Sequence, residues 1–225
     1  MGLVMPDVEF FSDLHCPHAY LTRYRLRQIN DEVPDDVSFR SRCLSIEYDK
    51  QAPTPKRILD VETHSLVLLE EQIPYEPWPD AEIAEWPSTF FPAFEAVKAA
   101  ESIDPEMAWE LDWRIRQAFF AEHACLTLRH VLADLAEDVG LARERFLEVY
   151  DDGHRAQVVA ETEEGWYEEG FTHSPAIRLP DGSTHVNPGA HRTEMDPERN
   201  FRLTSFDPGR EDEAEHLAEL IEDAV

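Results

Sequence analysis

Cysteine and long apolar runs are scarce in this sequence of 225 residues. Its three cysteines are Cys16, Cys43 and Cys125. They are too few and too widely spaced for a disulfide scaffold or a cysteine-based zinc site. No apolar run approaches the roughly 18 residues that cross a bilayer. The N-terminus lacks the basic and apolar segments of a secretory signal, so we expect a cytoplasmic protein without a membrane span.

Positive charge is scarce as well. Twenty basic residues stand against 48 acidic ones, and the formal net charge is −28. A surface with this charge repels phosphates, which excludes nucleic acids and anionic membranes as partners. The acidic residues are spread over segments that pattern as folded structure. They therefore indicate adaptation to a salt-rich cytoplasm and not an interaction tail.

The start of the sequence predicts a strand, a turn and a helix. Val8–Phe11 is an apolar run typical of a short strand. A polar turn follows, and Pro17 suits the first turn of a helix because its missing N–H needs no partner there. Cys16 therefore lies at the expected N-cap.

This position has chemical consequences for the thiol of Cys16. Free amide groups and the helix dipole stabilise a thiolate, so we expect a lowered pKa and a nucleophilic sulfur. His15 and His18 can add positive charge when they are protonated. The alternative is an inert, buried cysteine that only fills space.

The segment Asp13–Tyr20 resembles the active-site segment of DsbA-like thiol–disulfide oxidoreductases, especially their FrnE-like branch. That family carries Cys-Pro-x-Cys on a thioredoxin-like fold. Cys16, Pro17 and His18 match the first three positions, whereas Ala19 stands in place of the second cysteine. The resemblance implies disulfide exchange at Cys16, with Pro17 on the substrate side and His18 tuning the nucleophile.

Beyond the first helix, Val37–Leu44 alternates like a second strand, after a turn at Asp31–Asp36. A strand parallel to the first would complete a right-handed βαβ unit. Cys43 then reads as a packing residue.

The segment 51–169 reads as mostly helical and is cut into pieces by prolines. The predicted helices are Lys56–Gln72, Ser88–Ala100, Pro105–Ala121, Leu126–Val139, Ala142–Tyr150 and Arg155–Glu169. Two stretches, 116–120 and 132–141, resemble the helical insertion of the same family. Cys125 lies between them and is expected to be structural, with a role as a distant resolving thiol as the alternative.

A second informative stretch runs from Gly170 to Leu179. In thioredoxin-like proteins, a Ser-Pro bond that leads into a strand forms a cis-proline loop opposite the active-site cysteine. The resemblance therefore implies a cis Ser174–Pro175 bond, and a substrate-binding role for Ser174 with His173 as a neighbour of the thiol. A hairpin strand is expected to follow at Thr184–Gly189.

The expected fold is α/β, a thioredoxin-like βαβ…ββα sheet with a large all-helical insertion. Residues 1–50 and 170–225 are assigned to a discontinuous thioredoxin-like domain, and 51–169 to the insertion. We assign no structure to 191–209, and an acidic helix is expected over Glu211–Ala224.

The expected activity is monothiol reduction or isomerisation of disulfides, in a thiol- or disulfide-containing protein or small molecule. Without a second cysteine, an external thiol has to release the product, so we expect a small intracellular thiol as co-substrate and no tightly bound cofactor. The histidines lack metal-ligand spacing, so no metal site is expected. The sequence leaves the oligomeric state open, with a homodimer as one option.

Two other functions stay open. Kappa-class glutathione transferases and hydroxychromene-carboxylate isomerases resemble this layout but have a serine where Cys16 stands, and the sulfur of a bound small thiol reacts. The third hypothesis is a degenerate thioredoxin-like module that only binds partners. An ordinary or high pKa at Cys16 would favour that module.

Overall fold

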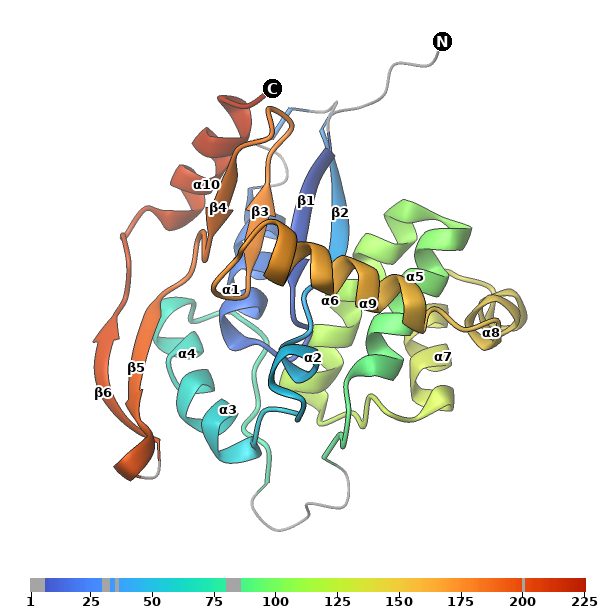
Figure 1. The fold of residues 1–225 in the computed structure, drawn as a ribbon, viewed down its shortest axis with the longest axis horizontal. Coiled ribbons are helices and arrows are strands. Elements are labelled where there is room, and N and C mark those ends of the chain that lie inside the picture. Colours follow the sequence, from blue (N-terminus) through green and yellow to red (C-terminus); the bar gives the residue numbers. More distant parts are fainter. Residues whose placement is uncertain (1–6, 30–32, 35–36, 80–85, 200) are drawn as a thin grey trace.

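A four-stranded mixed sheet forms the centre of the computed structural model (Figure 1). The structure describes residues 7–29, 33–34, 37–79, 86–199 and 201–225. The sheet has the order β2-β1-β3-β4, with the bounds β1 Asp7–Ser12, β2 Ser38–Cys43, β3 Ala176–Arg178 and β4 Thr184–Val186. β1 and β2 are parallel, whereas β3 is antiparallel to both β1 and β4. The predicted α/β thioredoxin-like fold is confirmed.

The central strand β1 is covered on both faces, which explains its apolar run. Val8 and Phe10 belong to a hydrophobic cluster with residues of α1 (Pro17–Gln28) and α10 (Glu213–Glu222). Phe11 packs in a different cluster with Leu44. A strand that is buried on both sides reads as a continuous apolar stretch and not as an alternation.

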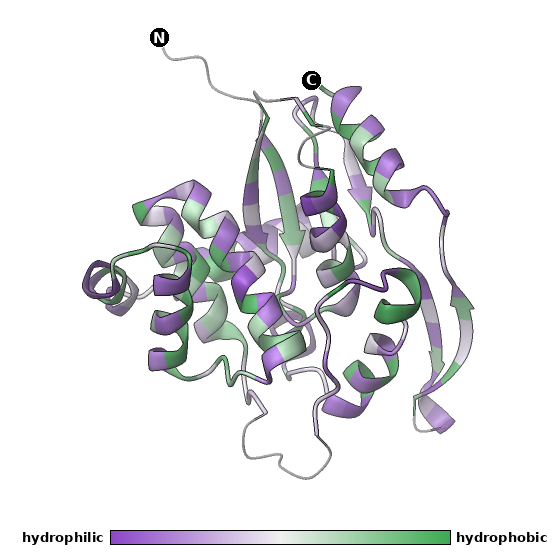
Figure 2. Ribbon diagram, turned by 180° about the vertical axis from the view of Figure 1, so that it is seen from behind, coloured by the Kyte–Doolittle hydropathy of each residue, from purple (hydrophilic) through white to green (hydrophobic). Residues whose placement is uncertain are grey.

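Helices occupy most of the chain between β2 and β3. Their bounds are α2 Ile46–Lys50, α3 Lys56–Thr63, α4 Leu66–Leu69, α5 Phe91–Ile103, α6 Pro105–Glu122, α7 Arg129–Asp138, α8 Arg143–Asp151 and α9 Arg155–Glu163. Apolar and polar residues interleave along these helices (Figure 2), and their apolar side chains build the largest hydrophobic cluster. The Asp104 carboxylate caps α6 by accepting from the amides of Glu106 and Met107. The exact division into two domains stays a prediction.

The prediction of one helix over Lys56–Gln72 is wrong. The chain forms α3 and α4 instead, separated by His64 and Ser65. The Ser65 hydroxyl donates to the backbone carbonyl of Glu62 at 2.6 Å. Serine side chains that bond to nearby backbone groups compete with the helical pattern, which accounts for the break.

The predicted helix Arg155–Glu169 also changes character. α9 ends at Glu163, and a π-helical turn follows at Glu164–Glu168. Gly165 lies in this turn, where a Cβ atom would come within 2.5 Å of a Leu44 methyl group. Only glycine allows the turn to lie this close to the residues beside the sheet.

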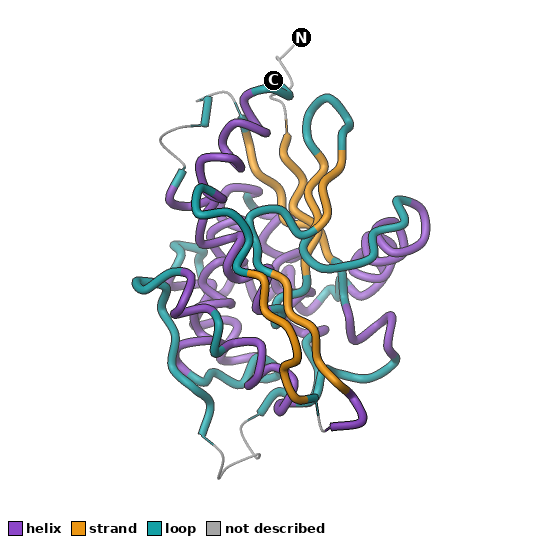
Figure 3. The backbone as a smooth tube through the Cα atoms, turned by 90° about the vertical axis from the view of Figure 1, so that its left-hand side faces the viewer, coloured by secondary structure: helices purple, strands orange, loops and turns teal. Residues whose placement is uncertain are grey.

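The region left unassigned, 191–209, contains a separate two-stranded antiparallel sheet (Figure 3). It consists of β5 (Arg192–Asp196), a 3₁₀ turn at Pro197–Arg199, and β6 (Arg202–Asp207). The C-terminal helix is confirmed as α10. The predicted turn Asp31–Asp36 lies mostly outside the described residues.

Candidate active site

Cys16 lies in the loop that connects β1 to α1. It is the N-cap residue of α1, with extended backbone angles, and Pro17 occupies the first helical position as predicted. The amide of Ala19 in the first turn points its N–H at the sulfur, while the thiol donates to the Ser174 carbonyl at 3.3 Å. Only 5% of the residue is exposed. The sulfur therefore lies between the helix start and the loop before β3.

The loop before β3 is tied directly to the loop that carries Cys16. The Ser174–Pro175 peptide bond is cis, as the motif predicts. The Ser174 hydroxyl accepts from the backbone amide of Asp13 at 2.8 Å, and both Ser174 and Pro175 are buried. Ser174 thus contributes two oxygens to the site, one to the Asp13 amide and one to the thiol.

The Asp13 carboxylate organises the turn before Cys16. It accepts from the amides of His15 at 3.0 Å and Ile46 at 2.7 Å, and one of its oxygens lies 2.5 Å from His15 Nδ1. The other ring nitrogen of His15 lies 2.8 Å from the Thr54 hydroxyl, and the ring stacks on Phe90 at 4.0 Å. His15 is fully buried, so it fixes the turn and does not face a substrate.

Arg116 anchors the same turn from the helical region, a role that sequence reasoning missed. Its guanidinium donates to the Asp13 carbonyl at 2.8 Å and to the Ser12 hydroxyl at 2.6 Å, and pairs with Asp112 at 2.9 Å. The side chain is fully buried. The only available signal was its place in the family-like insertion, because nothing in the local sequence links it to Cys16.

The expected lowering of the Cys16 pKa is wrong. Burial, with smaller contributions from the negative charges of Glu62 and Asp13, raises the pKa of Cys16 to about 12. The Ala19 amide lowers it, as a helix start should, but this effect is smaller than that of burial. The thiol is therefore neutral at pH 7 in this form of the protein.

His18 does not supply positive charge either. Its ring stacks on that of His191, with centroids 4.3 Å apart. Burial, with a smaller contribution from the nearby His173, lowers the pKa of His18 to about 4. The expectation that His18 adds positive charge beside the thiol is corrected, because its lowered pKa leaves the ring neutral at pH 7.

The remaining predicted residues lie at different distances from this chemistry. Pro17 is buried at the helix start, and His173 is exposed on the loop before β3. Cys43 is buried at the end of β2 and belongs to a different hydrophobic cluster from Cys16. The Cys125 sulfur lies 3.0 Å from the Thr127 hydroxyl, and all three cysteines are free thiols. The catalytic roles stay predictions.

None of the described helices is long and apolar enough to cross a bilayer. Among the same residues, no group of three or more histidine, cysteine, aspartate or glutamate side chains could hold a metal ion.

A family model matches the segment that contains all of these site features. The family model of the DSBA-like thioredoxin domain matches residues 7–195, which include Cys16, the helical region and the cis-proline loop. The chain belongs to the DSBA-like thioredoxin domain family. Comparison with curated protein sequences gives no significant match. Ala19 still distinguishes this member from relatives with two active-site cysteines.

Solved structures support the DSBA-like fold. The cytosolic disulfide reductase DsbM from Pseudomonas aeruginosa is 20% identical, with a TM-score of 0.71 over 97% of this chain and 100% of that one. A putative protein disulfide isomerase from Nitrosomonas europaea is 18% identical, with a TM-score of 0.64 over 84% and 92%. A 2-hydroxychromene-2-carboxylate isomerase is 15% identical, with a TM-score of 0.57 over 80% and 88%.

Proposed function

We propose that this protein reduces or isomerises disulfides through the single thiol of Cys16, and that a small intracellular thiol completes each cycle. The observation that carries this proposal is the position of the sulfur, at the start of α1 and 3.3 Å from the Ser174 carbonyl. A substrate that pairs with the loop at Ser174 would present its disulfide to Cys16. Pro17, Pro175 and the exposed His173 would border that substrate.

The cycle balances with one protein thiol. Cys16 loses its proton to water, and its sulfur attacks the substrate disulfide, so that one S–S bond breaks and a mixed disulfide forms. The other half of the substrate leaves as a thiol. A small thiol then attacks the substrate sulfur of the mixed disulfide, so that the Cys16 thiol is regenerated and the bound half of the substrate leaves as a disulfide with the small thiol. A second small thiol reduces that disulfide. Ala19 is buried and has no sulfur, so it cannot replace that external thiol.

The raised pKa of Cys16 sets the direction of electron flow. Proteins that stabilise the thiolate strongly are oxidants, because their reduced form is favoured. Here burial disfavours the thiolate, which favours a Cys16 that gives up electrons to substrate disulfides. The proposed reaction is therefore reduction or isomerisation and not oxidation.

The raised pKa of Cys16 also slows the reaction of the thiol while it is buried. At pH 7, a thiol with a pKa of about 12 reacts roughly 100-fold more slowly than an ordinary cysteine, because the loss of thiolate outweighs its greater nucleophilicity. We expect reaction from a form in which the hydrogen bond to Ser174 is broken and water reaches the sulfur.

One solved relative supports the choice of co-substrate. The DsbM structure determined with GSH has a TM-score of 0.68 at 19% identity, over 95% of this chain and 98% of that one. By analogy we propose a glutathione-like thiol here, without a tightly bound cofactor. A cytoplasmic location fits, because small thiols keep that compartment reducing.

The test is turnover of a peptide–glutathione mixed disulfide, with and without added glutathione. We expect turnover only when both Cys16 and glutathione are present. Without added glutathione, wild type should release one peptide and keep glutathione bound to Cys16 as a mixed disulfide, whereas the Ala19→Cys variant should release that glutathione as well, because it restores an internal resolving thiol. Wild-type turnover without added thiol would contradict the monothiol cycle, and Cys125→Ser and Cys43→Ser variants would then identify the resolving residue.

One observation favours a second function, an enzyme like the kappa-class transferases and hydroxychromene-carboxylate isomerases. A neutral Cys16 thiol can donate a hydrogen bond to the sulfur of a bound small thiol, as a serine would. Glutathione binding to a Cys16→Ser variant, measured by calorimetry, together with retained isomerase-type activity, would establish this function. The raised pKa of Cys16 also favours the third hypothesis, the binding module. Absence of any turnover and of thiol binding would establish that hypothesis over both enzymes.

A further inference from the structure

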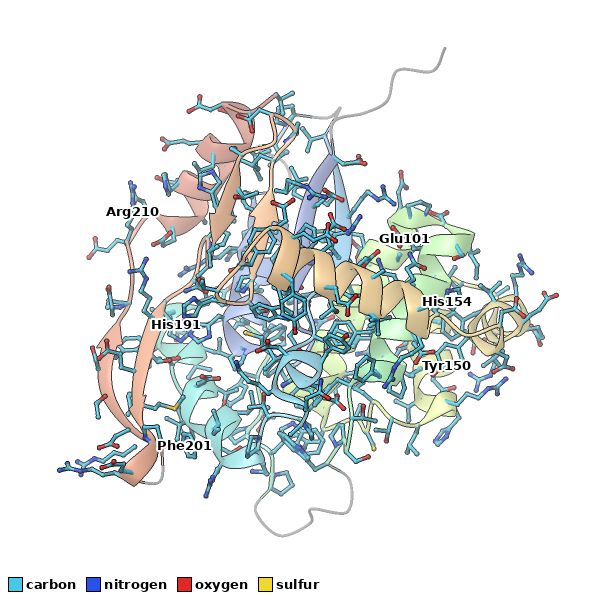
Figure 4. The ribbon with its side chains drawn as sticks, in the orientation of Figure 1. Glu101, Tyr150, His154, His191, Phe201 and Arg210 are labelled. Carbon is cyan, nitrogen blue, oxygen red and sulfur yellow. The ribbon has the colours of Figure 1, made fainter. Side chains whose placement is uncertain are left out.

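A second histidine, outside the Cys16–Ala19 motif, packs against the ring of His18. His191 lies in the segment between β4 and β5 and is fully buried. Figure 4 labels it where this segment meets α4. Its ring lies nearly parallel to that of His18, at 4.3 Å and 27°. The segment before β5 therefore contacts both α1, which is the active-site helix, and the start of α4.

The hydrogen bonds of Ser65 fix the protonation of His191. The Ser65 hydroxyl donates its one hydrogen to the Glu62 carbonyl at 2.6 Å. Its oxygen must then accept from His191 Nε2, which lies 2.7 Å away. Nε2 therefore carries a hydrogen, and Nδ1 has no hydrogen-bond partner among the described atoms. Burial lowers the pKa of His191 to about 3, so the ring is neutral at pH 7 and its Nδ1 is unprotonated.

An uncharged ring against His18 matters for the thiol. The His191 ring packs against one face of the His18 ring, so protonating either ring would place a positive charge in contact with the other imidazole. The nearby Arg25 and His173 are further groups whose positive charge opposes such protonation. Glu62 and Asp13 are the acidic groups that act on the Cys16 side.

We propose that His191 is a positioning residue that keeps the His18 ring uncharged beside Cys16, and that this contact selects reduction over oxidation. The proposal rests on the proposed function of Cys16. A cationic His18 would stabilise the thiolate and turn the site toward an oxidant. The contact between the two histidines thus acts on the direction of the reaction and not only on the fold.

The test measures the rate at which iodoacetamide alkylates Cys16 between pH 5 and 9, in a Cys43→Ser/Cys125→Ser background. In wild type we expect a rate that rises steadily with pH and has no inflection near pH 6. His191→Ala exposes His18, so we expect an inflection between pH 5 and 7 and a rate at pH 6 that is about tenfold higher. Adding His18→Asn should remove both effects.

Two further variants separate positioning from packing. His191→Phe keeps a ring over His18 and should retain the wild-type profile, and the exposed His130→Ala is the matched control. If His191→Ala does not fold, the ring of His18 in wild type is titrated by NMR, and we expect no protonation above pH 5. A His18 midpoint near 6.5 in wild type would overturn the proposal, as would a His191→Ala profile identical to wild type.

Failure of this proposal differs from failure of the proposed function. An unchanged alkylation profile together with glutathione-dependent turnover would reject the role of His191 alone. A His18-dependent inflection without any turnover would reject the enzymatic function and keep the contact.

Discussion

Cys16 and Cys43 are both buried at the carboxyl ends of neighbouring parallel strands, but their surroundings differ. Cys43 lies beside Lys98, whose ammonium donates to the Ser41 carbonyl and pairs with Glu101 and Glu161. Around Cys16, the charged groups that act on the thiol are the acidic Glu62 and Asp13. A buried cation therefore acts on Cys43, whereas the side-chain charges that act on Cys16 are negative. Unfavourable local electrostatics of this kind are typical of functional sites.

Exchanging each sulfur for oxygen tests this comparison most directly. Cys16→Ser should lower disulfide turnover by at least about 10³-fold, because the nucleophile is lost. Cys43→Ser should leave turnover within about twofold. The measurement is glutathione-dependent reduction of a mixed-disulfide peptide, with thermal melting to show that both variants fold. Equal losses in the two variants would remove the distinction.

The surroundings of Cys43 are tested by removing the charge of Lys98. Lys98→Met leaves Glu161 and Glu101 beside a buried apolar chain, and we expect a loss of about 3 kcal/mol in the free energy of unfolding, or roughly 6–12 °C in Tm. Lys50→Met is the control, because Lys50 is exposed and should cost less than about 0.5 kcal/mol. Chemical denaturation measures both. A Lys98 variant as stable as the control would show that its ion pairs contribute nothing.

Acidification should lower the free energy of unfolding, because the stacked rings of His18 and His191 are neutral in the folded protein. The folded-state pKa values of His18 and His191, about 4 and about 3, lie below their ordinary value of 6.5. Their contribution is complete above pH 6.5 and is lost as pH falls through 6.5 toward 4, because the unfolded chain binds these protons first. Between pH 7 and pH 5 we expect a loss of about 2 kcal/mol in the free energy of unfolding for each ring.

The acidic surface also titrates over this range, so the measurement is a comparison of unfolding curves. A His18→Phe/His191→Phe variant should lose less stability than wild type on acidification. Parallel pH dependences in the two proteins would contradict the assignment of neutral, buried imidazoles.

The smallest effect is expected from the acidic neighbour of the thiol. Burial raises the pKa of Glu62 to about 7, and its carboxylate in turn raises the pKa of Cys16. Glu62→Gln removes that charge, so alkylation of Cys16 at pH 8 should become a few-fold faster, with Glu71→Gln as an exposed control. A slower or unchanged rate would show that Glu62 does not act on the sulfur.

The predictions that succeeded depend on neighbours in sequence. Pro17 and the preceding apolar run placed Cys16 at the start of a helix, and the Ser174–Pro175 motif located the opposing loop. The predicted pKa failed because Glu62, 46 positions downstream, and burial by distant segments decide it. Arg116 was missed for the same reason. The hairpin β5–β6 escaped because β6 has no buried residue, so no apolar pattern marks it.

The packing of α10 has a practical consequence for work on this protein. The family match ends at residue 195, yet Leu217 and Ile221 of α10 lie in the same hydrophobic cluster as Cys16. A protein shortened to the matched segment would lack α10, and the apolar residues of α1 that pack in this cluster would be exposed to water. Expression boundaries chosen by homology alone would thus yield a chain whose loss of activity says nothing about its chemistry.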